Sequence, residues 1–375
     1  MKKRLLIFHS ALTPYRIDFF NVLATYFDCT VIFVSRNNKN QPFCQKELFE
    51  KCHFKRRYMD IRIVLPQNRV LNIGYLYYIL KYKPDIVIGA EYGLPTILPY
   101  LYKKLFLRKY TVYTICDDSI DIAENGGSLA RKKLRNYFVK RLDGLILVSQ
   151  DVARWYSSHF PLKQPPIVFP IVYNEDLYQR MLGQIMPISK VHQEHFGLKN
   201  KKIILFVGRL TEVKNIPLLI KAFYKLSDAD DVRLVLIGDG DKKDELKTLV
   251  QNLHLEDKVI FAGRFEGDKL YAWYNIANLF VLPSIYEPFG AVTAEALEAG
   301  CQVLCSDRAG SSGLINETNG KTFDPTNGNY LADLLAQSIS TMTYIDIDID
   351  DRKPRPSLLP YSFDNYVKNM IDLLH

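Results

Sequence analysis

Short apolar, β-branched runs alternate with amphipathic helical patterns along the chain, and this alternation limits the possible folds more than any other feature. In the first half, the strand-like runs include RLLIFHS (4–10), DIVIGA (85–90) and YTVYTIC (110–116), and a helical pattern follows each of them. Such alternation is typical of βαβ units, whose parallel strands are covered by helices on both faces of the sheet. We therefore predict an α/β fold built on doubly wound parallel sheets.

A proline-rich stretch interrupts this alternation once, and the alternation then restarts. Residues 161–200 contain five prolines, and the runs KKIILFVGR (201–209), RLVLIGDG (233–240) and LFVLPS (279–284) follow. A chain of 375 residues also exceeds the usual size of a single hydrophobic core. The sequence therefore predicts two Rossmann-like domains of similar construction.

The expected boundaries follow from this rhythm. We place an N-terminal domain at 1–170, a linker at 171–200 and a C-terminal domain at 201–360. A last helix at 361–375 is expected to pack back toward the N-terminal domain. Open parallel sheets bind ligands beyond the carboxyl ends of their strands, so we expect the two domains to face a central cleft that holds the ligand.

Charge is distributed unevenly between the two halves of the chain. Residues 1–180 hold 28 lysines and arginines against 15 acidic residues, a net charge of +13, whereas the remaining residues hold 21 against 26, a net charge of −5. Two basic segments that also carry aromatic and leucine side chains, at 100–110 and 129–141, lie in the first half. They predict contact with an anionic membrane surface, and ordinary solvated helix faces are the alternative.

Other sequence features indicate the compartment. No stretch of about 18 uncharged apolar residues is long enough to cross a bilayer, and the basic N-terminus lacks a signal-peptide cleavage site. The six cysteines are scattered, which suits a reducing compartment, and Cys301 and Cys305 are expected to be core thiols. We predict a cytoplasmic protein, with peripheral attachment to the inner face of the cytoplasmic membrane as a further expectation.

The first chemical motif is FVGRLTEVKN (206–215). A strand ends at Val207, and the loop that follows carries Arg209 and Lys214 before a helix begins near Asn215. Two cations beside a helix N-terminus favour an anion, because the backbone N–H groups and the helix dipole add to their charge. The motif predicts a diphosphate site, and solvated loop charges are the alternative.

The second motif is SIYEPFGAVTAEALEAG (284–300). Glu287 lies in a loop before a helix that Pro288 can open, and Glu295 lies inside that helix. Two carboxylates therefore flank a row of free backbone N–H groups, an arrangement suited to the hydroxyls and charged oxygens of a sugar phosphate. Alternatively, Glu287 only stabilises the helix dipole and Glu295 is a surface residue.

These motifs occur in order, with LIGDG (236–240) and FAGR (261–264) between them, and together they resemble the retaining nucleotide-sugar glycosyltransferases of family 4, which have the GT-B fold. The Glu-x7-Glu pattern of that family is intact, and the resemblance covers 202–320 closely and 1–170 more loosely. It implies a hexosyltransferase that moves a sugar from a UDP- or GDP-linked donor to a saccharide or lipid-linked acceptor, in surface polysaccharide, lipopolysaccharide or glycolipid biosynthesis. It also implies that the domain at 1–170 binds the acceptor and that the domain at 201–360 binds the nucleotide sugar.

The resemblance also assigns roles to matching residues. Arg209 and Lys214 would neutralise the donor diphosphate, and Glu287 would hold hydroxyls of the donor sugar. Glu295 would bind the ribose hydroxyls, and Arg264 would contact the base. Further donor contacts would come from the backbone N–H groups of Phe289, Gly290, Ala291 and Val292.

In the reaction that the resemblance implies, the acceptor attacks the face of the sugar that the diphosphate leaves, so the anomeric configuration is retained. An oxygen of the leaving group helps to remove the acceptor proton, and no protein nucleophile is needed. No cofactor and no metal ion are expected, because arginine and lysine handle the diphosphate. The carboxylates of CDDSID (116–121) are therefore not read as a metal site.

The first half departs from the family pattern in two places. Asp117 matches a family aspartate and is counted as catalytic, but Cys116 stands where many members carry a histidine. The loop HSALTPYR (9–16) lacks the usual glycine pair. Whether Asp117, Asp118 or His9 contacts the reacting sugar stays open.

Other functions were considered. A sugar-nucleotide epimerase or a phosphorylase would share the architecture, and a non-catalytic adaptor could dock on membranes through the basic half. No nucleic-acid partner is expected, because the aromatic and glycine signature of a single-strand-binding sheet is missing. A dinucleotide-dependent dehydrogenase is disfavoured because the first strand is not followed by GxGxxG.

Overall fold

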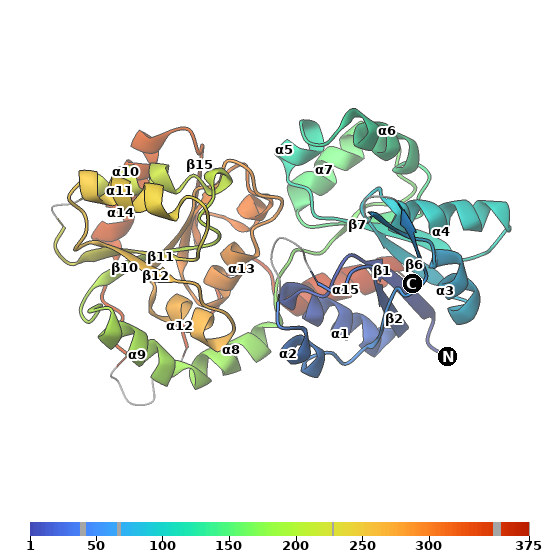
Figure 1. Ribbon diagram of the computed structural model, residues 1–375, viewed down its shortest axis with the longest axis horizontal. Coiled ribbons are helices and arrows are strands. Elements are labelled where there is room, and N and C mark those ends of the chain that lie inside the picture. The colour runs from blue at the N-terminus through green and yellow to red at the C-terminus, as the bar shows by residue number, and fades with distance from the viewer. Residues whose placement is uncertain (38–42, 66–68, 227–228, 348–353, 375) are drawn as a thin grey trace. The chain divides into compact units, whose positions relative to one another are not determined.

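The computed structural model describes residues 1–37, 43–65, 69–226, 229–347 and 354–374. The chain forms two compact units, the first made of Met1–Ile171 and Asp364–His375 and the second of Val172–Phe363. Figure 1 shows that each unit is a sheet covered by helices. The expected α/β class is therefore present twice.

The first unit contains a seven-stranded sheet in the order β3-β2-β1-β6-β7-β8-β9, and all of its strand pairs are parallel. Because β1 pairs with both β2 and β6, the direction of winding reverses between β1 and β6. β3 lies at one edge of the sheet. The strands are β1 (Arg4–His9), β2 (Asp28–Phe33), β3 (Lys55–Tyr58), β6 (Ile86–Ala90), β7 (Thr111–Cys116), β8 (Gly144–Leu147) and β9 (Ile167–Val168).

The helices of the first unit cover this sheet, and α15 joins them from the end of the chain (Figure 1). The Tyr366 ring of α15 lies 6.2 Å from that of Phe169, and the Tyr113 hydroxyl donates to the Leu373 carbonyl at 3.4 Å. A separate antiparallel hairpin joins β4 (Arg62–Leu65) to β5 (Arg69–Asn72). The helices are η1 (Pro14–Arg16), α1 (Ile17–Tyr26), α2 (Gln45–Glu50), α3 (Tyr75–Tyr82), α4 (Leu94–Leu105), α5 (Ile120–Glu124), α6 (Leu129–Phe138), α7 (Gln150–His159) and α15 (Phe363–Leu374).

The second unit contains a six-stranded parallel sheet in the order β12-β11-β10-β13-β14-β15. The winding reverses between β10 and β13, which pair directly, so the loops that follow these two strands lie side by side. The strands are β10 (Lys202–Val207), β11 (Val232–Ile237), β12 (Val259–Gly263), β13 (Leu279–Leu282), β14 (Gln302–Ser306) and β15 (Gly320–Phe323).

The stretch 171–200, which the sequence predicts to be a linker, instead contains two helices of the second unit. Asn174 caps the first of them, because its side chain accepts from the N–H of Leu177. Pro187 lies at the start of the second helix, where a missing N–H costs little. The helices of this unit are α8 (Glu175–Gln184), α9 (Met186–His195), η3 (Glu212–Lys214), α10 (Ile216–Tyr224), α11 (Lys243–Asn252), α12 (Asp268–Ile276), α13 (Ala291–Glu298), η4 (Gly310–Leu314) and α14 (Gly328–Thr341).

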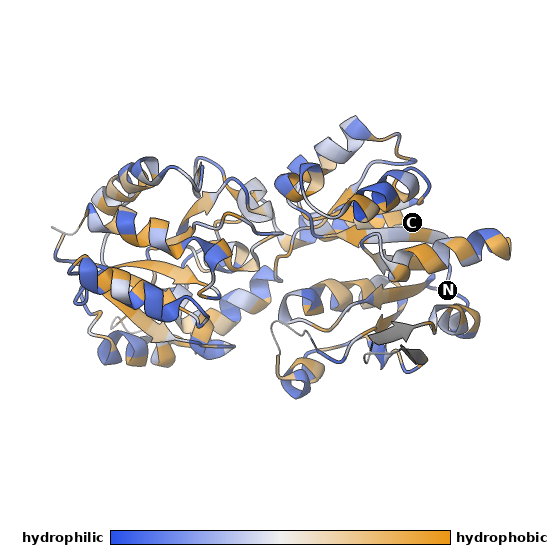
Figure 2. Cartoon of the chain, turned by 45° about the horizontal axis from the view of Figure 1, so that its top comes forward, coloured by the Kyte–Doolittle hydropathy of each residue, from blue (hydrophilic) through white to orange (hydrophobic). Residues whose placement is uncertain are grey.

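Each unit has its own hydrophobic core between the sheet and its helices. The strands are mostly hydrophobic in Figure 2, whereas the helices alternate hydrophobic and hydrophilic residues. Cys301 and Cys305 are buried free thiols, as the sequence predicts. In the described part of the chain, every helix is too short or too polar to cross a bilayer.

Candidate functional site

The two sequence motifs of the second unit meet at the ends of β10 and β13. The N–H of Ile285 donates to the Val213 carbonyl at 2.9 Å and ties the two loops together. Lys214 Nζ forms an ion pair with the Glu287 carboxylate, and only 12% and 13% of the two side chains are exposed. The structure thus joins one predicted cation and one predicted carboxylate, although they lie 73 residues apart.

Backbone contacts fix the loop that carries Glu287. Glu287 forms an isolated parallel bridge with Ala309, and its carbonyl accepts from the N–H of Gly310 at 3.2 Å. The Phe289 carbonyl accepts from the N–H of Ser311 at 2.8 Å. The segment containing η4 therefore supports the loop through backbone hydrogen bonds, so Glu287 is held on a constrained backbone.

The loop leads directly into α13 through Gly290. This residue has a φ of 91°, and a Cβ added here would lie 2.8 Å from Leu282 Cδ2 and 3.2 Å from Glu287 Cγ. Glycine is required both by this left-handed conformation and by the close packing. The Glu287 side chain therefore passes beside the first turn of α13.

The first N–H groups of α13 are available to a ligand. Among the described residues, those of Ala291 and Val292 donate no hydrogen bond, and no side chain caps the helix. A helix N-terminus of this kind favours an anion because its N–H groups and its dipole act together. Lys214 adds a positive charge nearby, because it pairs with Glu287, whose side chain passes beside this turn. This end of α13 can therefore bind a negatively charged oxygen.

Glu295 lies in the same helix but has different partners. Its side chain is buried, and its carboxylate accepts from the hydroxyls of Tyr173 at 3.0 Å and Tyr274 at 2.8 Å. Burial raises the pKa of this carboxyl above its usual value, although the two tyrosine hydrogen bonds act in the opposite direction. Glu295 therefore does not join the Lys214–Glu287 pair in this structure.

The two remaining predicted cations are placed differently. Arg209 is exposed, and in the described part of the chain it forms no ion pair, so its guanidinium can meet a ligand. Arg264 follows β12 and pairs with Glu266. The Gly208 carbonyl lies close to Gly238. A Cβ added to Gly238 would be 1.8 Å from the Gly208 carbonyl oxygen, which explains the first glycine in LIGDG.

Asp117 of the first unit forms an ion pair with the buried Arg16, a residue that sequence reasoning did not single out. Asp118 is buried and accepts from Arg131 at 2.8 Å, and burial raises its pKa. Its partner was also not foreseen, since nothing in the local sequence links the two. Asp117 remains the more exposed of the two aspartates.

His9 and Cys116 are the last residues of β1 and β7, two inner strands of the first sheet. His9 is buried, its Nδ1 lies 3.0 Å from the Ala11 carbonyl, and burial together with Arg16 lowers its pKa to about 4. Burial also raises the pKa of the Cys116 thiol well above its usual value. Near neutral pH, both side chains are therefore uncharged. No group of three or more metal-binding side chains occurs among the residues that the structure describes.

Comparison with known proteins bears on the region that contains the Lys214–Glu287 pair. Residues 188–342 match the family model described as glycosyl transferases group 1. This match lies within the second unit. The predicted resemblance to family 4 glycosyltransferases is confirmed by this match and by relatives with glycosyltransferase names.

Two curated relatives illustrate the sequence similarity. An uncharacterized glycosyltransferase of Methanocaldococcus jannaschii is 36% identical over 175 residues, which are 46% of this chain and 45% of that protein. The N-acetylgalactosamine-N,N'-diacetylbacillosaminyl-diphospho-undecaprenol 4-alpha-N-acetylgalactosaminyltransferase of Campylobacter jejuni is 38% identical over 196 residues, 52% of this chain and 49% of that one. The chain thus spans about half the length of the curated relatives it matches.

Solved structures extend the likeness to both units. Anabaena Alr3699/HepE in complex with UDP has a TM-score of 0.71 and 19% identity over 90% of each chain. The apo lipopolysaccharide outer core galactosyltransferase WaaB has a TM-score of 0.68 and 17% identity over 99% of each chain. At this identity the likeness concerns the fold, and it confirms the predicted GT-B class.

Proposed function

We propose that the protein is a retaining glycosyltransferase that moves a hexosyl group from a UDP- or GDP-linked sugar to a saccharide or lipid-linked acceptor. The observation that carries the proposal is the Lys214–Glu287 pair beside the free first turn of α13, inside the group 1 region. The name of the Campylobacter relative, which includes a diphospho-undecaprenol acceptor, and the UDP complex of the Anabaena structure are in line with this donor and acceptor.

The donor diphosphate would bind at the first turn of α13. Lys214 is held by Glu287 in the structure, and a phosphate oxygen can replace that carboxylate as its partner. Arg209 reaches the same ligand from the exposed part of its loop. Positive charge placed before the reaction stabilises the leaving group as its negative charge grows, which lowers the barrier without a metal ion.

Glu287, once released from Lys214, would accept hydrogen bonds from the donor sugar hydroxyls. Glu295 would accept from the ribose hydroxyls, which requires it to give up at least one of its two tyrosine partners. Arg264 would contact the base. Further donor contacts would come from the backbone of Phe289, Gly290, Ala291 and Val292.

In the transfer step, the acceptor hydroxyl oxygen forms a bond to the anomeric carbon on the face that the diphosphate leaves. The bond from that carbon to the diphosphate oxygen breaks, and the acceptor proton passes to a diphosphate oxygen. Asp117 is proposed to contact the reacting sugar from the first unit. Its ion pair with the buried Arg16 holds its side chain in place.

We also propose that the first unit, as the acceptor-binding unit, binds an anionic membrane on its cytoplasmic side. Around the end of α4, the exposed Leu105, Phe106 and Leu107 lie next to Lys104, Arg108 and Lys109 in the chain. Apolar side chains beside cations favour binding to anionic lipid headgroups. Lys103, by contrast, already pairs with Asp143 at 2.6 Å.

A direct assay tests the proposal. The purified protein is incubated with UDP-, GDP- and ADP-sugars, and release of the nucleoside diphosphate is followed with and without lipid-linked saccharide acceptors. We expect release from one donor class, and at least a tenfold loss of rate in Glu287→Ala and Arg209→Ala. A wild-type protein that releases nothing from any donor, or variants with unchanged rates, would refute the proposal.

A further inference from the structure

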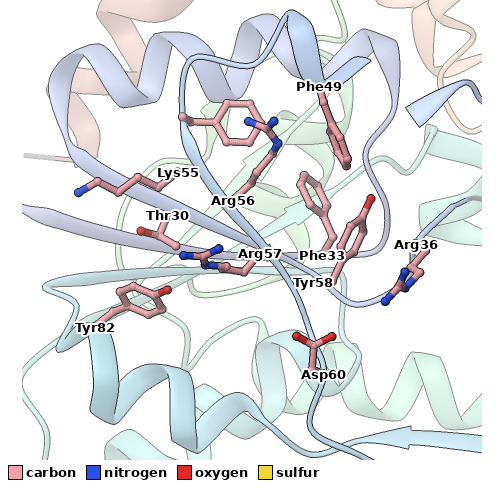
Figure 3. Close-up of a pocket in the computed structure, with 11 residues that line it drawn as sticks. Thr30, Phe33, Arg36, Phe49, Lys55, Arg56, Arg57, Tyr58, Asp60 and Tyr82 are labelled. Atoms are coloured by element: carbon pink, nitrogen blue, oxygen red, sulfur yellow. The ribbon is translucent and has the colours of Figure 1, made fainter. Parts of the chain in front are cut away.

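Positive charge is also concentrated in the first unit, at the edge of its seven-stranded sheet. The edge strand β3 reads Lys55-Arg56-Arg57-Tyr58, and a cavity of about 740 Å³ follows it (Figure 3). This volume is within the range of sites that hold small molecules. The described residues that line it are Thr30, Phe33, Arg36, Phe49, Phe54, Lys55, Arg56, Arg57, Tyr58, Asp60 and Tyr82.

Among the described residues that line this cavity, positive charges outnumber negative ones. Lys55 is neutralised by Asp28, at 2.7 Å. Arg36, Arg56 and Arg57 form no ion pair within the described part of the chain, and Asp60 is the single carboxylate among the described lining residues. Three guanidinium groups against one carboxylate leave a charge of +2 at one small site.

Aromatic rings hold two of these arginines in place. The Arg56 guanidinium lies 4.6 Å from the centre of the Phe49 ring, and that of Arg36 lies 5.6 Å from the centre of the Tyr58 ring. The Phe49 and Tyr58 rings are themselves 6.1 Å apart. Stacking on a ring orients a guanidinium without cancelling its charge, so its donors stay available to an anion.

Alternate residues of a strand point to opposite faces, so Arg56 and Arg57 line the cavity from the two sides of the strand edge. Charged side chains also protect a sheet edge against pairing with another strand, and that role needs no cavity and no ring. Edge protection leaves unexplained the stacked guanidiniums and the cavity that they line.

We propose that this cavity binds a phosphate group, with Arg56, Arg57 and Arg36 supplying the positive charge. The uncompensated charge of +2 matches a phosphate monoester, which carries about −1.5 to −2 near neutral pH. A carboxylate would balance only half of it. The planar guanidinium also fits phosphate oxygens with two parallel hydrogen bonds. The site is separate from the donor site, since all of its residues lie in the first unit.

The test uses full-length Lys214→Ala protein, in which the donor site is weakened, and calorimetric titration with pyrophosphate at low ionic strength. We expect binding, and at least a tenfold loss of affinity in the added double variant Arg56→Gln/Arg57→Gln. Lys247→Gln/Lys321→Gln removes the same charge from exposed positions of the second unit and should change the affinity less than about twofold. Arg56→Lys/Arg57→Lys keeps the charge without the planar donors and should give an intermediate loss.

Phosphatidic acid vesicles, whose headgroup is a phosphate monoester, separate the two sources of the phosphate. If soluble pyrophosphate binds and the Arg56/Arg57 variant loses it, the site accepts soluble phosphates. If only vesicles bind, and this variant but not the Lys247/Lys321 variant releases them, the phosphate is a lipid headgroup. Equal losses in both double variants would show nonspecific attraction and overturn the proposal, as would the absence of binding to either probe. Circular dichroism confirms that each variant is folded.

Discussion

The ion pair between Lys214 and Glu287 gives the most specific energetic prediction. Each side chain is only about one-eighth exposed, so removing either partner leaves a largely buried charge without its counterion. Breaking buried pairs in this way costs about 3–5 kcal/mol, and the residual exposure places this pair near the lower end, at about 3 kcal/mol. We therefore expect Lys214→Met and Glu287→Gln each to lower the free energy of unfolding of the second unit by about 3 kcal/mol.

The double variant should cost little more than either single variant, because it leaves no buried charge. The coupling energy from the double-mutant cycle should accordingly be about 3 kcal/mol. For a unit of this size, 3 kcal/mol corresponds to a fall in Tm of about 6–12 °C.

Fluorescence can report on the second unit alone. The chain has two tryptophans, Trp155 in the first unit and the fully buried Trp273 in the second. In a Trp155→Phe background, urea unfolding followed by fluorescence therefore measures the second unit, and the four members of the cycle can be compared directly. Strictly additive losses would refute the reasoning, because they would mean that the two charges do not depend on each other.

Three further predictions concern other groups. Because burial raises the pKa of Glu295, the folded protein keeps a proton that the unfolded chain loses, and this contribution to stability is lost as pH rises. The stability of the wild type relative to Glu295→Gln should therefore fall in urea titrations as pH rises above the ordinary glutamate pKa of 4.5, and a constant difference would contradict this. A thiol reagent added to the native protein should modify the exposed Cys44 and leave the buried thiols unmodified, namely Cys29, Cys116, Cys301 and Cys305. Modification of all six cysteines before unfolding would contradict this prediction. Excess EDTA should leave nucleotide release within about twofold of the untreated rate; loss of activity restored by a divalent cation would exclude the proposed charge neutralisation by Arg209 and Lys214 alone.

Local patterns in the sequence predict the architecture well for a physical reason. Strands buried on both faces leave continuous apolar runs, and β10 and β13 lie at two of the runs that the sequence points to. The sequence does not reveal the helices at 175–195, because a high density of prolines is typical of linkers, whereas Pro187 begins a helix instead of interrupting one.

The site was predicted in part. Lys214 and Glu287 come together because their strands are neighbours in the sheet, and the ordered motifs point to both. The partners of Glu295 could not be foreseen: Tyr173 lies 122 residues away, and no local pattern distinguishes this tyrosine from the other 23 in the chain. The pairing of Arg16 with Asp117 also joins distant segments, so only the fold can show it.

The cavity along β3 shows a different limit of sequence reading. In the sequence, Lys55, Arg56 and Arg57 are three of many cations in a basic half, and their charge alone indicates a solvated surface. The rings that orient Arg56 and Arg36 come from α2 and from β3 itself. A site of this kind depends on which side chains surround the cations, and that is decided by the packing of α2 against the sheet edge.

Calorimetric titration with UDP and GDP tests the central claim most directly, because that claim is that the second unit binds a nucleoside diphosphate beside α13. The experiment is run at a temperature where every variant is folded. The account predicts that one of the two nucleotides binds the wild type, that Lys214→Met weakens it at least tenfold, or about 1.4 kcal/mol, and that Arg108→Gln/Lys109→Gln leaves it unchanged. Failure of both nucleotides to bind the wild type, or equal affinity in Lys214→Met, would contradict it.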